Sequence, residues 1–492
     1  MSSLPFFKST FYSRILYHAR HNPHAAAVVF GSQQVSYGDF ARDIERATRQ
    51  LALRLPSRSG LAMLSLSHPY LHWVLALALG RIGMCTVSVF DRSHTLDLIK
   101  PDLVFVDAHA EKTDGRFVEV DQEWIGRAAD ALPPFVDPEH RPEDPFRLVL
   151  SSGTTGTPKK IVLTHQMFQH RLQAVALDAG LTGRQSRTLV LVGMDTAGGH
   201  LLPMSTWFIG GCAVLWMPGE DPYQTIAGKG VNYTFLAPVQ LDHLLRSMPA
   251  AAWPMPELTV AVGGSSLPRL LSEKARARLT PTVLIVYGST EAGLLSICHA
   301  GMSDTIPGVT GIVRAGVDIQ IVDPAGKPLP AGEVGEVRCR SLDCVSGYLD
   351  PDASGADSEE IFREGWFYPG DAGTLSSAGA LSIVGRTKDL MNLGGVKISP
   401  TEVEEMLAAC PGVLDIAAFT LEHDDAVAAP WVAVVKGPDY DQALLAGVFR
   451  QNFPRLPALK FAHADVIPRN QMGKIQRNLI RDQVRQALAK GV

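Results

Sequence analysis

The chain has 492 residues, of which 46% are hydrophobic and 19% are charged. Lys and Arg together number 45, and Asp and Glu number 50, which gives a net charge of −5. This balance argues against a disordered chain and against the strongly basic surface that non-specific nucleic-acid binding requires. We therefore expect a folded protein that binds no nucleic acid. The length is enough for roughly three domains, or for one large domain and a smaller one.

The six cysteines are sparse for a chain of this length and include no Cys-x-x-Cys pair. This pattern predicts neither a disulfide framework nor a finger-type zinc site, and it favours a reducing cytoplasm. The apolar stretch at residues 73–79 is far shorter than the roughly 20 residues that a membrane helix needs. We expect no membrane span.

In chain order, residues 28–36 predict two strands joined by a turn, followed by a helix from about Asp39. Short apolar runs bounded by Gly, Ser and Pro then recur, and such runs are typical of strands buried on both faces of parallel sheets. They span residues 61–66, 103–106, 148–150, 189–192 and 283–286. The predicted fold class is therefore α/β.

From Asp318 the chain changes to short alternating runs with close turns, which predict a small antiparallel or barrel-like unit ending near Gly385. We place a domain boundary there, giving a domain of residues 1–385 and a second of residues 386–492.

The second domain has its own helix start. Ser399 can cap this helix, Pro400 suits its first position, and Glu402 completes a capping box. Strands over residues 416–419 and 431–435 and a terminal helix from about Ile475 should follow.

A loop rich in hydroxyls and glycines lies between two strand-like runs. Its backbone N–H groups, hydroxyls and one cation could bind a phosphate. The residues are Ser151, Ser152, Gly153, Thr154, Thr155, Gly156 and Lys159. The glycine spacing differs from that of a Walker A loop, and no Ser or Thr follows the lysine. The alternative is a flexible loop without a ligand.

A second segment, residues 286–293, lies where a buried strand ends and a helix is expected to begin, a usual place for ligands in open α/β sheets. Thr290 can donate to a phosphate oxygen, and Glu291 offers the anionic oxygen that Mg²⁺ prefers. The alternative is a plain turn capped by Thr290. Upstream, residues 262–266 form a small-residue strand end that a flat ring or an acyl group could approach closely.

Three further segments lie toward the C-terminus. Asp371 follows an aromatic-rich turn and could accept hydrogen bonds from both ribose hydroxyls, with Arg386 as an added donor. Gly394 and Gly395 would let a narrow chain pass close to the backbone. Lys474 stands on a turn near the C-terminus, where an ordinary surface lysine is the alternative.

Together and in this order, the five segments resemble those of the adenylate-forming superfamily, which includes acyl-CoA synthetases, aryl-acid ligases, peptide-synthetase adenylation domains and luciferases. The resemblance extends from about residue 28 to residue 486. It implies a large N-terminal domain of two α/β sheets and a small β-barrel, joined at a hinge to a smaller, mobile α+β C-terminal domain.

The resemblance also implies roles for single residues. Lys474 would be the adenylation lysine, Thr290 and Glu291 would bind phosphate and Mg²⁺, and Lys388 would be the hinge. Asp371 and Arg386 would bind the ribose, and Gly394 and Gly395 would line the pantetheine path. Further nucleotide contacts would come from the phosphate loop, residues 151–159, and from Gly263, Gly264, Ser265, Tyr287, Gly288 and Ser289.

The implied enzyme is an acid–thiol ligase. It would use ATP and Mg²⁺ to convert a small carboxylic acid into an acyl- or aryl-adenylate. It would then pass the acyl group to coenzyme A or to the phosphopantetheine of an acyl or peptidyl carrier protein. The alternatives are a stand-alone amino-acid-activating enzyme and a catalytically inactive nucleotide- or acyl-binding relative. No feature of the sequence demands luciferase-like oxygen chemistry.

The acid pocket gives conflicting indications. Residues 193–203 occupy the place where acyl-CoA synthetases usually carry an aromatic residue followed by His at the acyl pocket. Asp195 resembles instead the Asp that holds an amine in amino-acid-activating domains. The spacing from Asp195 to Gly210 fits the acyl-CoA type. We expect Asp195, His200, Gly264 and Gly288 to line the pocket. The alternatives are a hydrogen-bonded loop aspartate for Asp195 and a structural histidine for His200.

Two other positions depart from the family pattern. Lys160 replaces the usual Gly after the loop lysine, and Pro369 replaces the usual Thr before the final Gly-Asp. Neither is a catalytic position.

Overall fold

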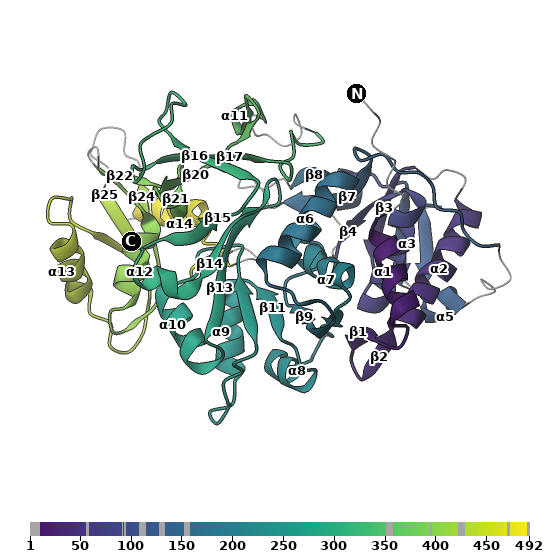
Figure 1. Cartoon of the computed structure of the whole chain (residues 1–492). Helices are drawn as coiled ribbons and strands as arrows, with labels where there is room; N and C mark the ends of the chain where they lie inside the picture. Colours follow the sequence, from purple (N-terminus) through teal and green to yellow (C-terminus); the bar gives the residue numbers. More distant parts are fainter. Residues whose placement is uncertain are drawn as a thin grey trace.

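The computed structural model describes residues 10–55, 59–90, 92, 95–107, 115–126, 133–151, 158–350, 358–393, 396–421, 429–469 and 473–489. Two large sheets with helices packed against them make up most of this part of the chain (Figure 1). Within the described residues, no helix is long and apolar enough to cross a membrane.

The first sheet has six strands in the order β6-β5-β3-β4-β7-β8 and is parallel except for the β7–β8 pair. Its strands are β3 Leu61–Ser65, β4 Cys85–Ser88, β5 Leu103–Asp107, β6 Phe117–Val120, β7 Pro145–Ser151 and β8 Lys159–Thr164. The central residues of β3 and β5 are buried, as expected for strands that are covered on both faces. The first three apolar runs of the sequence are thus strands of this sheet.

The second sheet begins as a parallel block and continues as antiparallel strands. The parallel block is β1 Ala26–Phe30, β9 Arg187–Val190, β10 Cys212–Leu215, β11 Tyr233–Leu236, β12 Thr259–Val262 and β13 Thr282–Ser289, with β2 Gln33–Ser36 at its edge. The antiparallel strands are β14 Gly293–His299, β15 Val309–Val313, β16 Val317–Val322, β17 Gly335–Ser341, β18 Phe362–Arg363, β19 Trp366–Phe367, β20 Asp371–Leu375 and β21 Ala380–Arg386. The expected antiparallel unit therefore continues the second sheet.

Helices precede or separate most of these strands. They are α1 Thr10–His21, α2 Tyr37–Arg54, α3 Pro69–Ile82, α4 Thr95–Ile99, α5 Gln122–Gly126, α6 His165–Asp178, α7 Ala197–Ile209, α8 Pro222–Gly228, α9 Pro238–Ser247, α10 Arg269–Arg278 and α11 Ser358–Ile361. The largest core joins α2, α3 and α7, where Trp73, Trp207 and Phe40 pack at ring distances of 5.0 to 5.1 Å.

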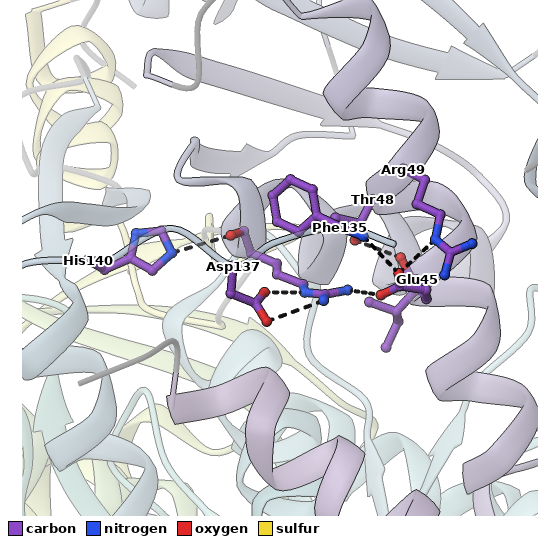
Figure 2. Close-up of polar contacts among 8 residues, drawn as sticks. Glu45, Thr48, Arg49, Phe135, Asp137 and His140 are labelled. Carbon is purple, nitrogen blue, oxygen red and sulfur yellow. Dashed lines mark hydrogen bonds and ion pairs between the residues drawn. The ribbon is translucent and has the colours of Figure 1, made fainter. Parts of the chain in front are cut away.

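A buried guanidinium fixes the segment that leads into β7. Arg81 of α3 forms ion pairs with Glu45 of α2 and with Asp137, and its carbonyl accepts a hydrogen bond of 3.3 Å from His140. Its guanidinium also lies 3.9 Å from the ring centre of Tyr12. Figure 2 shows this network between α2 and the segment that carries Asp137 and His140. Since a buried charge is stable only when it is paired, the network holds this segment firmly against the helices.

The C-terminal part forms a smaller α+β unit beside β20 and β21 (Figure 1). Its elements are β22 Met391–Leu393, β23 Val396–Ile398, α12 Pro400–Ala408, β24 Val413–Leu421, β25 Ala429–Lys436, α13 Gln442–Asn452, β26 Lys460–His463 and α14 Arg477–Ala489. The strands predicted at residues 416–419 and 431–435 are confirmed as β24 and β25. The boundary at Arg386 stays a prediction.

The predicted capping box at Ser399 is wrong. Helix α12 begins at Pro400 as expected, but Ser399 makes no side-chain capping hydrogen bond, so the capping box with Glu402 is not formed. The Ser399 hydroxyl is buried and faces Gly385 of β21, where an added Cβ would lie 3.4 Å from it. Packing against β21 therefore overrides the local capping preference.

Candidate active site

The two ends of the predicted phosphate loop are held by the β7–β8 pair. Ser151, the last residue of β7, is the register partner of Lys159, the first residue of β8. Ser152, Gly153, Thr154, Thr155 and Gly156 lie outside the described residues. The pKa of Lys159 is lowered by burial, with Arg386 and Lys388 adding repulsion, and the nearby Glu291 carboxylate opposes this shift.

Thr290 and Glu291 form the tip of a β-hairpin between β13 and β14, so the helix expected after residue 289 is wrong. The pairing of β14 with β15 extends the sheet here and keeps the chain extended. A Cβ on Gly288 would lie only 2.2 Å from the carbonyl oxygen of Gly293, so the hairpin requires glycine at this position.

The backbone of this hairpin tip is bound by a buried arginine of α6. Arg171 donates hydrogen bonds of 2.9 Å to the Thr290 carbonyl, 3.1 Å to the Glu291 carbonyl and 2.6 Å to the Asp343 carbonyl. Only 1% of its surface is exposed. Arg171 thus fixes the backbone that carries Glu291.

Asp371 and Arg386 are register partners on β20 and β21, and they form an ion pair of 3.2 Å. The other carboxylate oxygen of Asp371 accepts a 2.6 Å hydrogen bond from the hydroxyl of Tyr287. A carboxylate has about four acceptor positions, so Asp371 keeps the capacity to bind two ribose hydroxyls.

Lys474 lies on a turn that contacts α9. Arg469 donates a hydrogen bond of 3.0 Å to the Gly473 carbonyl, and a Cβ on Gly473 would lie 3.1 Å from Cβ of Val239. Lys474 keeps an exposed surface, yet surrounding protein atoms and the positive charge of Arg386 lower its pKa. The carboxylates of Asp371 and Glu291 oppose that shift, which places Lys474 near both.

Asp195 is half-buried just before α7. Burial raises the pKa of its carboxyl group, while its own N–H, the charge of Arg147 and the N–H of Thr196 oppose the shift. Arg147 is 1% exposed and donates hydrogen bonds to the Ser88 hydroxyl at 2.7 Å and to the Met194 carbonyl at 3.2 Å. The buried guanidinium of Arg147 therefore contacts the loop that carries Asp195.

His200 is 2% exposed and stacks on Trp73 at a ring distance of 4.7 Å. The Phe168 ring is arranged edge-on to it, with 5.7 Å between the ring centres, and burial lowers the pKa of His200 well below its usual value. This environment favours the structural alternative over a ligand contact.

The other predicted residues are placed as follows. Gly263, Gly264 and Ser265 follow β12, and a Cβ on Gly263 would lie 3.1 Å from both the Phe235 ring and the Val286 carbonyl oxygen. Ser289 accepts a hydrogen bond of 3.1 Å from the Ala292 N–H. Lys388 is exposed between β21 and β22. Gly394 and Gly395 lie outside the described residues.

Three residues of the site were missed at the sequence level: Arg147, Arg171 and Tyr348, the last of which contacts Lys159 and Glu291 through its hydroxyl. An arginine next to the apolar run at residues 148–150 could have indicated a buried charge. Nothing local distinguishes Arg171 or Tyr348, because their partners are far away in the sequence.

The family of AMP-binding enzymes matches residues 16–349 of this chain. A feruloyl-CoA synthase from Amycolatopsis sp is 29% identical over 418 residues, which cover 80% of this chain and 82% of that protein. An indoleacetate–CoA ligase from Aromatoleum aromaticum is 26% identical over an aligned length of 514 positions, gaps included, which covers 96% of this chain and 97% of that protein. The crystal structure of ATP-bound MatB from Rhodopseudomonas palustris has a similar fold, with a TM-score of 0.82, 23% identity and coverage of 97% and 99%.

The chain belongs to the AMP-binding enzyme family. The predicted α/β fold with a smaller C-terminal domain is confirmed. This AMP-binding enzyme is an ATP-dependent acid–thiol ligase, as the order of the five motifs predicts.

Proposed function

We propose that this AMP-binding enzyme activates an aryl carboxylic acid as its adenylate and transfers the aryl-acyl group to coenzyme A. The observation that carries the proposal is that two lysines lie near the carboxylate of Glu291. Lys159 and Lys474, which come from distant parts of the chain, both lie close enough to Glu291 for its carboxylate to oppose the lowering of their pKa values by burial. Lys474 lies near Asp371 as well.

In the first step, an oxygen of the acid attacks the α-phosphorus of ATP, and the bond to pyrophosphate breaks. Lys159 would bind the departing phosphates, and Asp371 would hold the ribose. Lys474 would stabilise the negative charge that develops between the acid and the α-phosphate, where an ammonium is most effective in a partly desolvated site.

The donor set fits Mg²⁺. Among the described residues there is no group of three or more His, Cys, Asp or Glu side chains that could hold a metal. Mg²⁺ is usually held by one or two carboxylates together with phosphates and waters, so Glu291 alone is sufficient on the protein side. Bound there, Mg²⁺ would neutralise phosphate charge.

In the second step, the thiol sulfur attacks the carbonyl carbon of the adenylate, the thiol proton is lost, and AMP leaves. Rotation of the C-terminal unit about Lys388 would withdraw Lys474 and bring Gly394 and Gly395 to the pantetheine path. The named relatives are CoA ligases, which supports coenzyme A over a carrier protein as the acceptor. The six free thiols support a reducing cytoplasm as the location.

Two observations support an aryl acid as the substrate: the substrates named for the relatives, and two exposed glycines of the expected acid pocket. Feruloyl and indoleacetate groups both carry an aromatic ring. Gly264 and Gly288 are exposed and have no side chain, so a flat ring could approach the backbone closely there.

A panel of aryl, straight-chain and amino acids in a pyrophosphate-release assay tests the proposal. We expect release that requires acid, ATP and Mg²⁺, with a higher kcat/KM for an aryl acid than for a straight-chain acid of equal carbon number. With coenzyme A present, the aryl thioester should accumulate. A preference for amino acids, or an adenylate that coenzyme A cannot discharge, would contradict it.

A further inference from the structure

Tyr348 lies between the phosphate-loop lysine and the proposed Mg²⁺ carboxylate. Lys159 donates a hydrogen bond of 3.1 Å to the Tyr348 hydroxyl, and that hydroxyl donates one of 3.1 Å to Oε1 of Glu291. A phenol has one proton, an ammonium only donates and a carboxylate only accepts, so the direction of both hydrogen bonds is fixed.

Backbone contacts hold the segment around Tyr348 on both sides. The Val345 N–H donates to the Glu291 carbonyl at 2.9 Å, and the Leu349 N–H donates to the Lys160 carbonyl at 3.0 Å. The Lys160 side chain also forms an ion pair with Asp350. The segment therefore joins the Glu291 hairpin to the start of β8.

The ring of Tyr348 is packed independently of its hydroxyl. It lies edge-on to Phe362 at a ring distance of 5.2 Å, and Tyr348 is 7% exposed. The hydroxyl consequently has a fixed position before nucleotide binds, which reduces the cost of ordering the site.

We propose that Tyr348 is a positioning residue for the metal–nucleotide complex: its hydroxyl orients the Glu291 carboxylate for Mg²⁺ and keeps Lys159 from pairing directly with it. This inference rests on the proposed function, which assigns Glu291 to Mg²⁺ and Lys159 to phosphate.

Loss of the Tyr348 hydroxyl should weaken metal binding, because the Lys159 ammonium and the metal would then compete for the Glu291 carboxylate. Without the hydroxyl, the ammonium of Lys159 can move onto Glu291 and form a direct ion pair. The metal must then displace that ammonium, and the carboxylate has lost the partner that oriented it. Removing such an orienting partner typically lowers metal affinity by roughly 10- to 100-fold.

The test compares Tyr348→Phe with the matched variant Tyr70→Phe. Tyr70 is 8% exposed, stacks on Phe30 at 5.2 Å and donates a 2.6 Å hydrogen bond to Asp43. Both substitutions remove a phenolic hydroxyl that donates to a carboxylate and keep the aromatic ring, but Tyr70 lies away from the site.

The direct readout is Mn²⁺ binding by electron paramagnetic resonance in the presence of α,β-methylene-ATP, without acid or turnover. We expect the Mn²⁺ dissociation constant to rise about 10-fold in Y348F and to stay at the wild-type value in Y70F. In turnover, the Mg²⁺ concentration for half-maximal pyrophosphate release should rise by the same factor, while kcat at saturating Mg²⁺ is retained. Thioester formation from preformed aryl-adenylate should be unchanged and checks that Y348F is folded.

A wild-type Mn²⁺ dissociation constant in Y348F would overturn the inference, and so would an equal rise in Y70F. The failure of the proposed function looks different. In that case the wild-type enzyme releases no pyrophosphate in response to any acid, whatever the Mn²⁺ titrations of the variants show.

Discussion

The hydroxyl of Tyr287 donates a hydrogen bond of 2.6 Å to Oδ2 of Asp371, while Arg386 pairs with Oδ1 of the same carboxylate at 3.2 Å. Tyr287 stands near the end of β13, and Asp371 begins β20. The Tyr287 hydroxyl therefore joins the strand that leads to Glu291 to Asp371, the carboxylate proposed to bind the ribose. The carboxylate is oriented from both sides before a nucleotide arrives.

Replacing Tyr287 with Phe should weaken nucleotide binding. Loss of a hydrogen bond to a charged group costs about 1.5 to 3 kcal/mol, so we expect KM for ATP to rise about 10-fold or more with a smaller change in kcat. Steady-state kinetics at saturating acid measure this. Tyr37→Phe is the control, since the Tyr37 hydroxyl donates a 2.7 Å hydrogen bond to the Gly211 carbonyl in the core. An equal effect in both variants would contradict the prediction.

Replacing Lys474 with Ala should separate the two half-reactions. Adenylate formation should fall by roughly 10²- to 10³-fold, the usual effect of removing a group that stabilises transition-state charge. Thioester formation from preformed adenylate should be largely spared, because the lysine acts in the first step only. Lys436→Ala, an exposed lysine of β25, serves as the control. Equal losses in both half-reactions would refute the assignment.

Replacing Lys388 with Pro tests the hinge. Proline fixes φ near −65° and stiffens the peptide about which the C-terminal unit should rotate. We expect adenylation to survive and thioester transfer to fall. Lys388→Ala controls for the loss of charge and should retain both steps. If the proline variant performs both steps at wild-type rates, the hinge lies elsewhere.

Replacing Asp195 with Ala tests whether this carboxylate faces the substrate. If it does, an acid with an amino or hydroxyl donor should lose about 1 to 3 kcal/mol of transition-state binding, the cost of unpairing a buried polar group. The unsubstituted analogue should lose less, so the ratio of the two kcat/KM values would fall. An unchanged ratio would mean that Asp195 is structural.

His165 at the start of α6 should make the fold sensitive to mild acid. Burial, with repulsion from the stacked His140, lowers its pKa to about 4, against an ordinary value of 6.5. The unfolded chain takes up the proton first as the pH falls below 6.5, so stability declines down to about pH 4. The loss at pH 5 is at most about 2 kcal/mol. Thermal melts of His165→Gln should show a weaker dependence between pH 7 and 5. His243→Gln, at an exposed position of α9, should match the wild type.

Much of the architecture follows from local patterns. The apolar runs at residues 61–66 and 103–106 are strands because continuous apolar sequence can be satisfied only where both faces of a sheet are covered. Thr290 and Glu291 could be singled out because hydroxyl and carboxylate groups at a strand end suit phosphate and Mg²⁺. The order of the five motifs was enough to predict the enzyme class.

Tertiary structure decided the rest. The chain after Glu291 forms a strand because β15 pairs with it, and Ser399 turns toward β21 instead of capping its own helix. Tyr348 and Lys159 are hydrogen-bonded although they are 189 positions apart in the sequence, and Arg171 is hydrogen-bonded to Asp343, which is 172 positions away. Local periodicity carries no information on such contacts, because they depend on how distant segments pack. The sequence therefore determined which residues could do the chemistry, and packing decided which residues hold them in place.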